Sequence, residues 1–201
     1  KVVAVQTYDG KLFGLDFNTG QRLWIYNSNL PILTIRGTGT PLVKDSKVYA
    51  GFANGRVMAF DISTGSILWE TRVAIAQGRS DIERIVDIDG TMSMQGDQLF
   101  AAAYQGRVVA IDISDGSRVW QREVSSISGT SVGFGNVYVV DDDGTIYAYL
   151  ASGQGLRWDQ DSLRYRDLSR PTPILGYVAV VDFEGYLHFL SQLDGEFVGR
   201  A

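Results

Sequence analysis

Closely spaced acidic residues are the first candidates for chemistry in this chain. Asp87 and Asp89 flank one isoleucine in ERIVDIDG, and three consecutive aspartates precede Gly144. Carboxylates placed in this way could hold a cation, transfer protons, or bind a basic group on a partner. His188 is the only histidine and there is no cysteine, which excludes thiolate nucleophiles and zinc sites built from several histidines or cysteines.

An internal repeat predicts the secondary-structure elements that position these residues. Five segments, of which ANGRVMAFDISTGSILW and YQGRVVAIDISDGSRVW are the clearest, align without gaps on one glycine. The glycines are Gly10, Gly55, Gly106, Gly144 and Gly185. A tryptophan follows each of the first four glycines by 14 residues, and these are all the tryptophans of the chain: Trp24, Trp69, Trp120 and Trp158.

Each copy indicates short antiparallel strands joined by tight turns. An acidic or amide residue precedes the first glycine, which is typical of a hairpin, and Asp-x-Ser/Asn-Thr/Asp-Gly predicts a second turn. A strand such as KVYAGFA lies ahead of the first glycine, and segments such as GTPLVKD can supply a fourth strand. Four short strands recurring about every 40 residues predict an all-β fold, a β-propeller of four-stranded antiparallel blades.

The repeat also predicts the domain organisation. We expect one partial propeller domain over 1–201 with about four to five blades. The expected blade cores are about 1–27, 39–74, 89–125, 130–163 and 171–201, with insertions at about 28–38 and 75–88. The chain begins within a blade and without an initiator methionine, so we expect further sequence upstream. We also expect missing blades, or a second copy, to cover the open edges.

Within the repeat, most candidate residues have a structural interpretation. The four tryptophans should dock one blade on the next, each with its indole N–H bonded to backbone. His188 occupies an otherwise apolar column and should be a packed core residue. Asp16, Asp61 and Asp112 recur at one turn position and should cap it. The three consecutive aspartates align with a hairpin turn and lack the spaced ligands of a calcium loop.

The two insertions are the more informative candidates, because loops of adjacent blades should lie side by side on one face. The first contains Leu33, Ile35 and Arg36, and the second contains Asp87 and Asp89 beside several aliphatic residues. Aliphatic anchors with an arginine and acids favour a protein interface. In the alternative, the apolar residues tuck inward and the charges cap loop turns.

Composition narrows the classes of partner. The net charge is −5, from 18 basic and 23 acidic residues, which disfavours a nucleic-acid partner because such proteins present a basic face. No apolar run approaches the roughly 20 residues that cross a bilayer as a helix.

The segments MAFDISTGSILW and VAIDISDGSRVW resemble the tryptophan-docking repeat of pyrroloquinoline-quinone-type propellers. The order LTIRG, NGRVMA, DIERIVDIDG and VVDFEGYLHFL is similar, more narrowly, to the BamB family of outer-membrane β-barrel assembly lipoproteins. This resemblance runs over nearly the whole chain. It implies the C-terminal half or more of an eight-bladed propeller.

The family resemblance implies a non-catalytic scaffold without a cofactor or metal, at the periplasmic face of the outer membrane of a Gram-negative bacterium. It implies that Leu33, Ile35, Arg36, Asp87 and Asp89 contact the POTRA domains of BamA, where isoleucine replaces the family's second leucine. Asp87 and Asp89 would meet basic groups on the partner or orient Arg36. Membrane association would be only through a lipid anchor absent from this chain.

Three further possibilities remain open at this stage. Unfolded outer-membrane proteins could bind, for example by adding a strand to an exposed blade edge. The chain could self-associate through its open propeller edges. A quinoprotein dehydrogenase is the alternative from another class, but such enzymes usually need a central calcium, an aspartate base and often a vicinal cysteine pair, which this chain lacks.

Overall fold

The fold is built from antiparallel sheets of short strands. A computed structural model of the protein describes residues 1–29, 31, 39–75, 80, 85–88 and 90–201. In this part of the chain all regular elements are strands, and strands adjacent in sequence are adjacent in each sheet. The predicted all-β partial propeller of four-stranded antiparallel blades is confirmed. The described residues contain no helix long and apolar enough to cross a membrane.

The first sheet has three strands and the other four sheets have four strands each. Blade 1 contains β1 (Val2–Gln6), β2 (Lys11–Asp16) and β3 (Arg22–Asn27). Blade 2 contains β4 (Leu42–Lys44), β5 (Lys47–Phe52), β6 (Arg56–Asp61) and β7 (Ile67–Arg72). Blade 3 contains β8 (Ser93–Gln95), β9 (Gln98–Ala102), β10 (Val108–Asp112) and β11 (Arg118–Arg122). Blade 4 contains β12 (Thr130–Gly133), β13 (Asn136–Val140), β14 (Ile146–Leu150) and β15 (Leu156–Gln160). Blade 5 contains β16 (Thr172–Ile174), β17 (Tyr177–Val181), β18 (Leu187–Ser191) and β19 (Phe197–Arg200).

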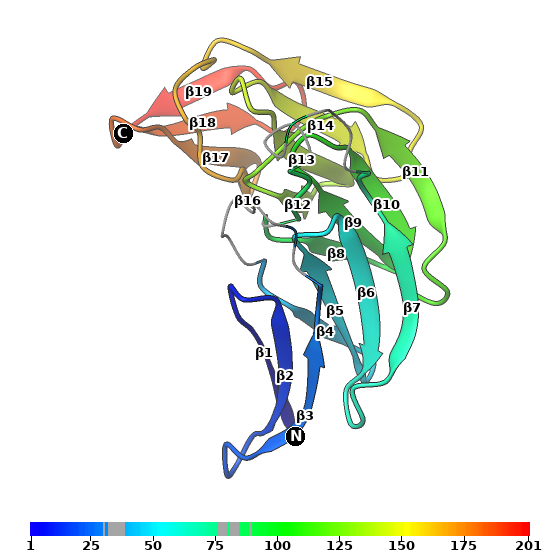
Figure 1. The fold of residues 1–201 in the computed structure, drawn as a ribbon. Coiled ribbons are helices and arrows are strands. Elements are labelled where there is room, and N and C mark those ends of the chain that lie inside the picture. Colours follow the sequence, from blue (N-terminus) through cyan, green and yellow to red (C-terminus); the bar gives the residue numbers. More distant parts are fainter. Residues whose placement is uncertain (30, 32–38, 76–79, 81–84, 89) are drawn as a thin grey trace.

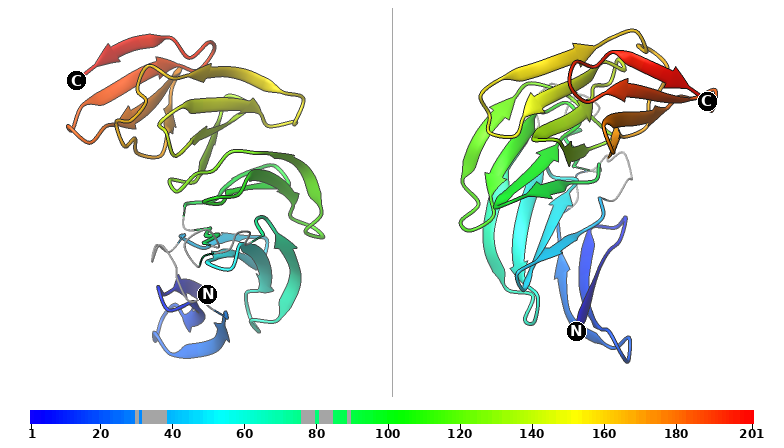
Figure 2. Two further views of the ribbon diagram at one scale, coloured as in Figure 1. Left: turned by 45° about the horizontal axis from the view of Figure 1, so that its top comes forward. Right: turned by 180° about the vertical axis from the view of Figure 1, so that it is seen from behind.

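The blades follow one another in chain order along an open arc. Blade 1, in blue, and blade 5, in orange and red, stand at its two ends (Figures 1 and 2). The short first strand of blade 4, β12, contacts the first strands of both neighbouring blades, β8 and β16. Loops that leave equivalent ends of neighbouring blades are therefore brought near each other, although they are far apart in sequence.

In blades 1, 2 and 3 an aspartate caps the turn between the last two strands. In blade 2, Asp61 Oδ1 accepts hydrogen bonds from the backbone N–H groups of Ser63 and Thr64, at 3.0 and 2.9 Å. The hydroxyl of Ser63 also donates to this oxygen, and these bonds lower the pKa of Asp61 to about 2. Asp16 and Asp112 accept equivalent bonds, so the predicted capping role is confirmed at all three positions.

Each tryptophan packs against the turn of the following blade and hydrogen-bonds to it. The indole N–H groups of Trp24, Trp69, Trp120 and Trp158 donate to the carbonyls of Ile62, Ile113, Ala151 and Gln192 at 2.8, 3.1, 2.9 and 3.0 Å. A large apolar ring is thereby buried between two blades while its one polar group is satisfied. These contacts fix the angle between neighbouring blades, and with it the position of the loops.

The two ends of the arc keep apolar side chains exposed. In β17, Val178 and Val180 are buried against blade 4, whereas Tyr177 and Val181 alternate with them and are exposed. In β1 the exposed residues include Val3 and Val5. That further blades or a second copy of the chain cover these faces stays a prediction.

Candidate protein-binding site

The second insertion returns to the propeller through a buried segment. Val86 and Ile88 belong to the core cluster shared by blades 2 and 3. A Cβ atom on Gly51 of β5 would stand 2.5 Å from Ile88 Cγ2, so the side chain of Ile88 fills the space that this glycine leaves open. The backbone N–H of Tyr104 in blade 3 donates to the carbonyl of Asp87 at 2.9 Å. The end of the insertion is therefore anchored to both blades.

Asp87, one of the predicted contact residues, is buried. Its exposed fraction is 1%, so in this structure its side chain is enclosed by the chain itself. For Val86 and Ile88, the alternative in which the apolar residues tuck inward is the one observed. The alternation of apolar and acidic types in Val86, Asp87 and Ile88 gave no indication that all three would be buried.

The remaining predicted contact residues are not placed by the structure. Leu33, Ile35, Arg36 and Asp89 lie outside the described residues. Where the second insertion ends, a Cβ atom on Gly90 would stand 2.3 Å from the backbone nitrogen of Gly129, and Thr91 forms a parallel bridge with Gly129. This close backbone approach ties the end of the insertion to the chain segment that enters blade 4.

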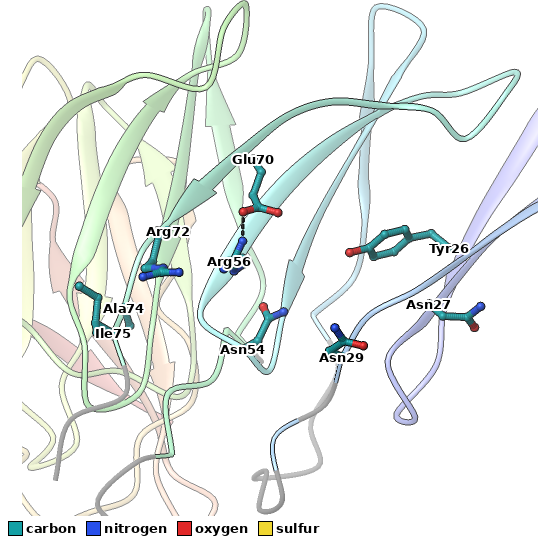
Figure 3. A pocket seen from close by; sticks show the side chains of 9 residues that line it. All are labelled: Tyr26, Asn27, Asn29, Asn54, Arg56, Glu70, Arg72, Ala74 and Ile75. Atoms are coloured by element: carbon teal, nitrogen blue, oxygen red, sulfur yellow. Dashed lines mark hydrogen bonds and ion pairs between the residues drawn. The ribbon is translucent and has the colours of Figure 1, made fainter.

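A cavity of about 500 Å³ lies where the two insertions begin (Figure 3). Asn29, at the start of the first insertion, and Ile75, at the start of the second, both line it. Blade 1 contributes Tyr26, whose hydroxyl is directed toward the β6–β7 hairpin of blade 2. Sequence reasoning missed this cavity, because its walls come from two blades whose spacing depends on tryptophan docking.

Three charged residues of blade 2 form one wall of the cavity. Arg56 on β6 and Arg72 on β7 are directly opposite each other in the strand register. Glu70, two residues before Arg72 and on the same face of the strand, forms an ion pair with Arg56. The side chain of Arg72 has no ion pair or hydrogen bond within the described part of the chain. The wall therefore carries one positive charge in excess.

The consecutive aspartates form a capped hairpin turn. Asp141 Oδ1 accepts hydrogen bonds from the backbone N–H groups of Asp143 and Thr145 at 3.0 and 2.8 Å. Burial raises the pKa of Asp142, which also accepts a hydrogen bond from Ser125. Among the described residues no group of three or more histidine, cysteine or acidic side chains is arranged to hold a metal ion.

His188 is buried, as its apolar column predicts, but it is part of a charged network. Its Nε2 lies 2.9 Å from Asp182 Oδ2, and Arg166 Nε donates to the same oxygen at 2.8 Å. Asp182 Oδ1 accepts the backbone N–H groups of Glu184 and Tyr186, each at 3.0 Å. Burial raises the pKa of Asp182, but these hydrogen bonds outweigh it and hold the pKa well below its ordinary value. This arrangement stabilises the first turn of blade 5.

Comparison with known proteins identifies the family. The sequence model of the family described as "Outer membrane protein assembly factor BamB" matches residues 1–160. The chain belongs to the BamB family. The assembly factor BamB of Pseudomonas aeruginosa is 49% identical over 86% of this chain and 46% of that protein. BamB of Yersinia pestis is 35% identical over 99% of this chain and 51% of that protein. The chain thus spans about half the length of these relatives.

Solved structures agree with the family assignment. The crystal structure of BamB from Moraxella catarrhalis superposes with a TM-score of 0.93 at 34% identity, covering 100% of this chain and 60% of that one. A quinohemoprotein alcohol dehydrogenase from Comamonas testosteroni gives a TM-score of 0.78 at 15% identity, covering 100% of this chain and 41% of that one. The likeness to the dehydrogenase shows a common fold alone, whereas the resemblance to BamB is confirmed.

Proposed function

We propose that this chain is part of a non-catalytic scaffold subunit of the outer-membrane β-barrel assembly (BAM) complex. It would bind the periplasmic POTRA domains of BamA and assist the folding and insertion of outer-membrane proteins. Membership of the BamB family, whose relatives are named as assembly factors, supports this role. The observation that carries the site is the cavity at which both insertions begin, between Asn29 and Ile75.

Both insertions would contribute residues that contact BamA. Leu33 and Ile35 supply apolar anchors, and Arg36 supplies hydrogen bonds or a salt bridge. Asp89 meets a basic group of the partner or orients Arg36. Asp87 is buried, and its carbonyl, which accepts the backbone N–H of Tyr104, helps to anchor the end of the second insertion to blade 3. Loss of a desolvated anchor such as Arg36 should cost about 2 kcal/mol of binding free energy or more.

The proposed location is the periplasmic face of the outer membrane. Unfolded outer-membrane proteins are candidate additional partners, because exposed edge strands can accept another strand.

A pull-down of BamA from solubilised outer membranes tests the proposal with the whole protein. Wild type should recover BamA, and the double variant Leu33→Ala with Arg36→Ala should lose most of it. Arg22→Ala, which removes an exposed arginine at the far end of β3, is the matched control and should behave as wild type. Undiminished recovery by a folded double variant would contradict the assignment of the first insertion.

A further inference from the structure

Two arginines face each other across the β6–β7 hairpin, which is an unfavourable arrangement in an isolated blade. Arg56 and Arg72 are register partners, and like charges directly opposite each other in a sheet destabilise it. Glu70 compensates Arg56 through an ion pair. Arg72 is left without an anionic partner among the described residues, at the wall of a cavity that opens beside both insertions.

In blade 3 the same two register positions hold a cation and an acid instead of two cations. Arg107 follows the first glycine of blade 3, as Arg56 does in blade 2, and Glu123 stands three residues after the tryptophan, as Arg72 does. Arg107 Nη2 lies 3.2 Å from Glu123 Oε1, so this hairpin neutralises its own arginine. The repeat can therefore hold an acid at this position, and blade 2 differs by presenting a cation.

The equivalent cavity between blades 3 and 4 has the opposite charge. It measures about 320 Å³, and its lining includes four acids, Glu123, Asp141, Asp142 and Asp143. Glu123 and Asp143 form ion pairs with Arg107 and Arg164, so Asp141 and Asp142 carry the excess negative charge. An acidic group would be repelled there and attracted to the cavity beside Arg72. The charge of the cavity lining therefore changes from positive at blade 2 to negative at blade 4.

We propose that Arg72, assisted by Arg56, binds a carboxylate group from an acidic segment of a protein partner in the cavity between blades 1 and 2. A guanidinium presents paired N–H donors that match the two oxygens of a carboxylate. The amide of Asn54 and the hydroxyl of Tyr26 line the same cavity and provide further polar groups for the segment. The proposal rests on the proposed function for the kind of partner, because the cavity adjoins the two insertions.

The test uses the whole protein and a short fluorescein-labelled oligoglutamate peptide, with binding followed by fluorescence anisotropy at low salt. Wild type should bind it, and Arg72→Glu should weaken binding about tenfold. Arg22→Glu introduces the same charge change at the far end of β3, about 15 Å along the strand, and should change binding less than about twofold. An oligolysine peptide should not bind in an Arg72-dependent way.

Stability measurements separate binding from folding. Arg72→Glu gives blade 2 the opposed arginine and glutamate of blade 3, so its urea midpoint should equal or exceed that of wild type. If Arg72→Glu is unstable, Arg72→Gln takes its place in the binding assay with the same expected loss.

The outcomes distinguish this inference from the proposed function. Equal peptide affinity for wild type and the Arg72 variant, no binding by wild type, or an equal loss in Arg22→Glu would overturn the inference. Arg72-dependent sedimentation with phosphatidylglycerol vesicles in the absence of peptide binding would overturn it as well, in favour of a membrane surface. BamA recovery by wild type reports separately on the proposed function, which stands if BamA is retained while the peptide result is negative.

Discussion

Gly65 of blade 2 packs directly against the indole of Trp24 from blade 1. A Cβ atom on Gly65 would stand 2.6 Å from Cδ2 of that ring, and its φ of +71° is left-handed. The contact recurs between Trp69 and Gly116, and between Trp158 and Gly195. One glycine therefore meets two separate needs, the conformation of its own turn and the close approach of the preceding blade.

Substituting Gly65 should be more costly than substituting a glycine with the same conformation alone. We expect Gly65→Ala to lower the free energy of unfolding of this chain by about 2 to 4 kcal/mol, from left-handed strain and overpacking together. Gly20 has a φ of +69°, but a Cβ atom there would meet no other atom within 4 Å, so Gly20→Ala should cost about 1 kcal/mol. Urea denaturation measures the free energy of unfolding of both variants. Equal losses would show that contact with Trp24 adds nothing to the cost at Gly65.

The buried end of the second insertion should contribute to stability. We expect Ile88→Ala to lower the free energy of unfolding by about 2 to 5 kcal/mol, because it empties a packed site between Gly51 and blade 3. Ile75→Ala is the control, since Ile75 is 57% exposed, and should cost less than about 0.5 kcal/mol. Similar values for the two variants would argue against the anchoring of this segment.

Asp182 should make stability depend on acidity. Its pKa in the folded protein lies below the ordinary value of 3.8, so its ionised form stabilises the fold above about pH 4 and this contribution is lost as pH falls through the folded pKa. Asp182→Asn should lower the urea midpoint at about pH 7, and its difference from wild type should narrow toward about pH 3. Asp97→Asn, at an exposed position, should show little difference at either pH. A difference in urea midpoint between wild type and Asp182→Asn that widens as the pH falls would contradict this assignment.

Exposed apolar side chains at the end of the arc should make this chain associate in solution. We expect light scattering to report a mass that rises with concentration, because Tyr177 and Val181 offer an apolar face next to an open sheet. Val181→Glu should reduce the association. Val119→Glu, on an exposed position of β11 in a middle blade, should not. A concentration-independent monomer mass for wild type would exclude this mode of self-association.

The repeat pattern was sufficient to predict the fold, because each blade is a local unit. Glycine at a left-handed position, an aspartate cap and alternating apolar residues act within about 40 residues, so their spacing can be read directly. The same locality explains why the capping role of Asp61 and the burial of His188 followed from their columns in the alignment. It also explains why the network of His188 with Asp182 and Arg166 did not, since Arg166 comes from the connection before the blade.

The amino-acid sequence by itself determined the blades, their turns, the docking tryptophans and the family, since these depend on residue types at regular spacing. Only the tertiary structure decided that Asp87 is enclosed, that Ile88 fills the space above Gly51, and that Arg72 and Arg56 lie side by side in one wall of a cavity. The physical reason is that burial and charge balance depend on which surfaces neighbouring blades bring together. ERIVDIDG stands outside the repeat, and no local pattern specifies which of its side chains turn toward the core.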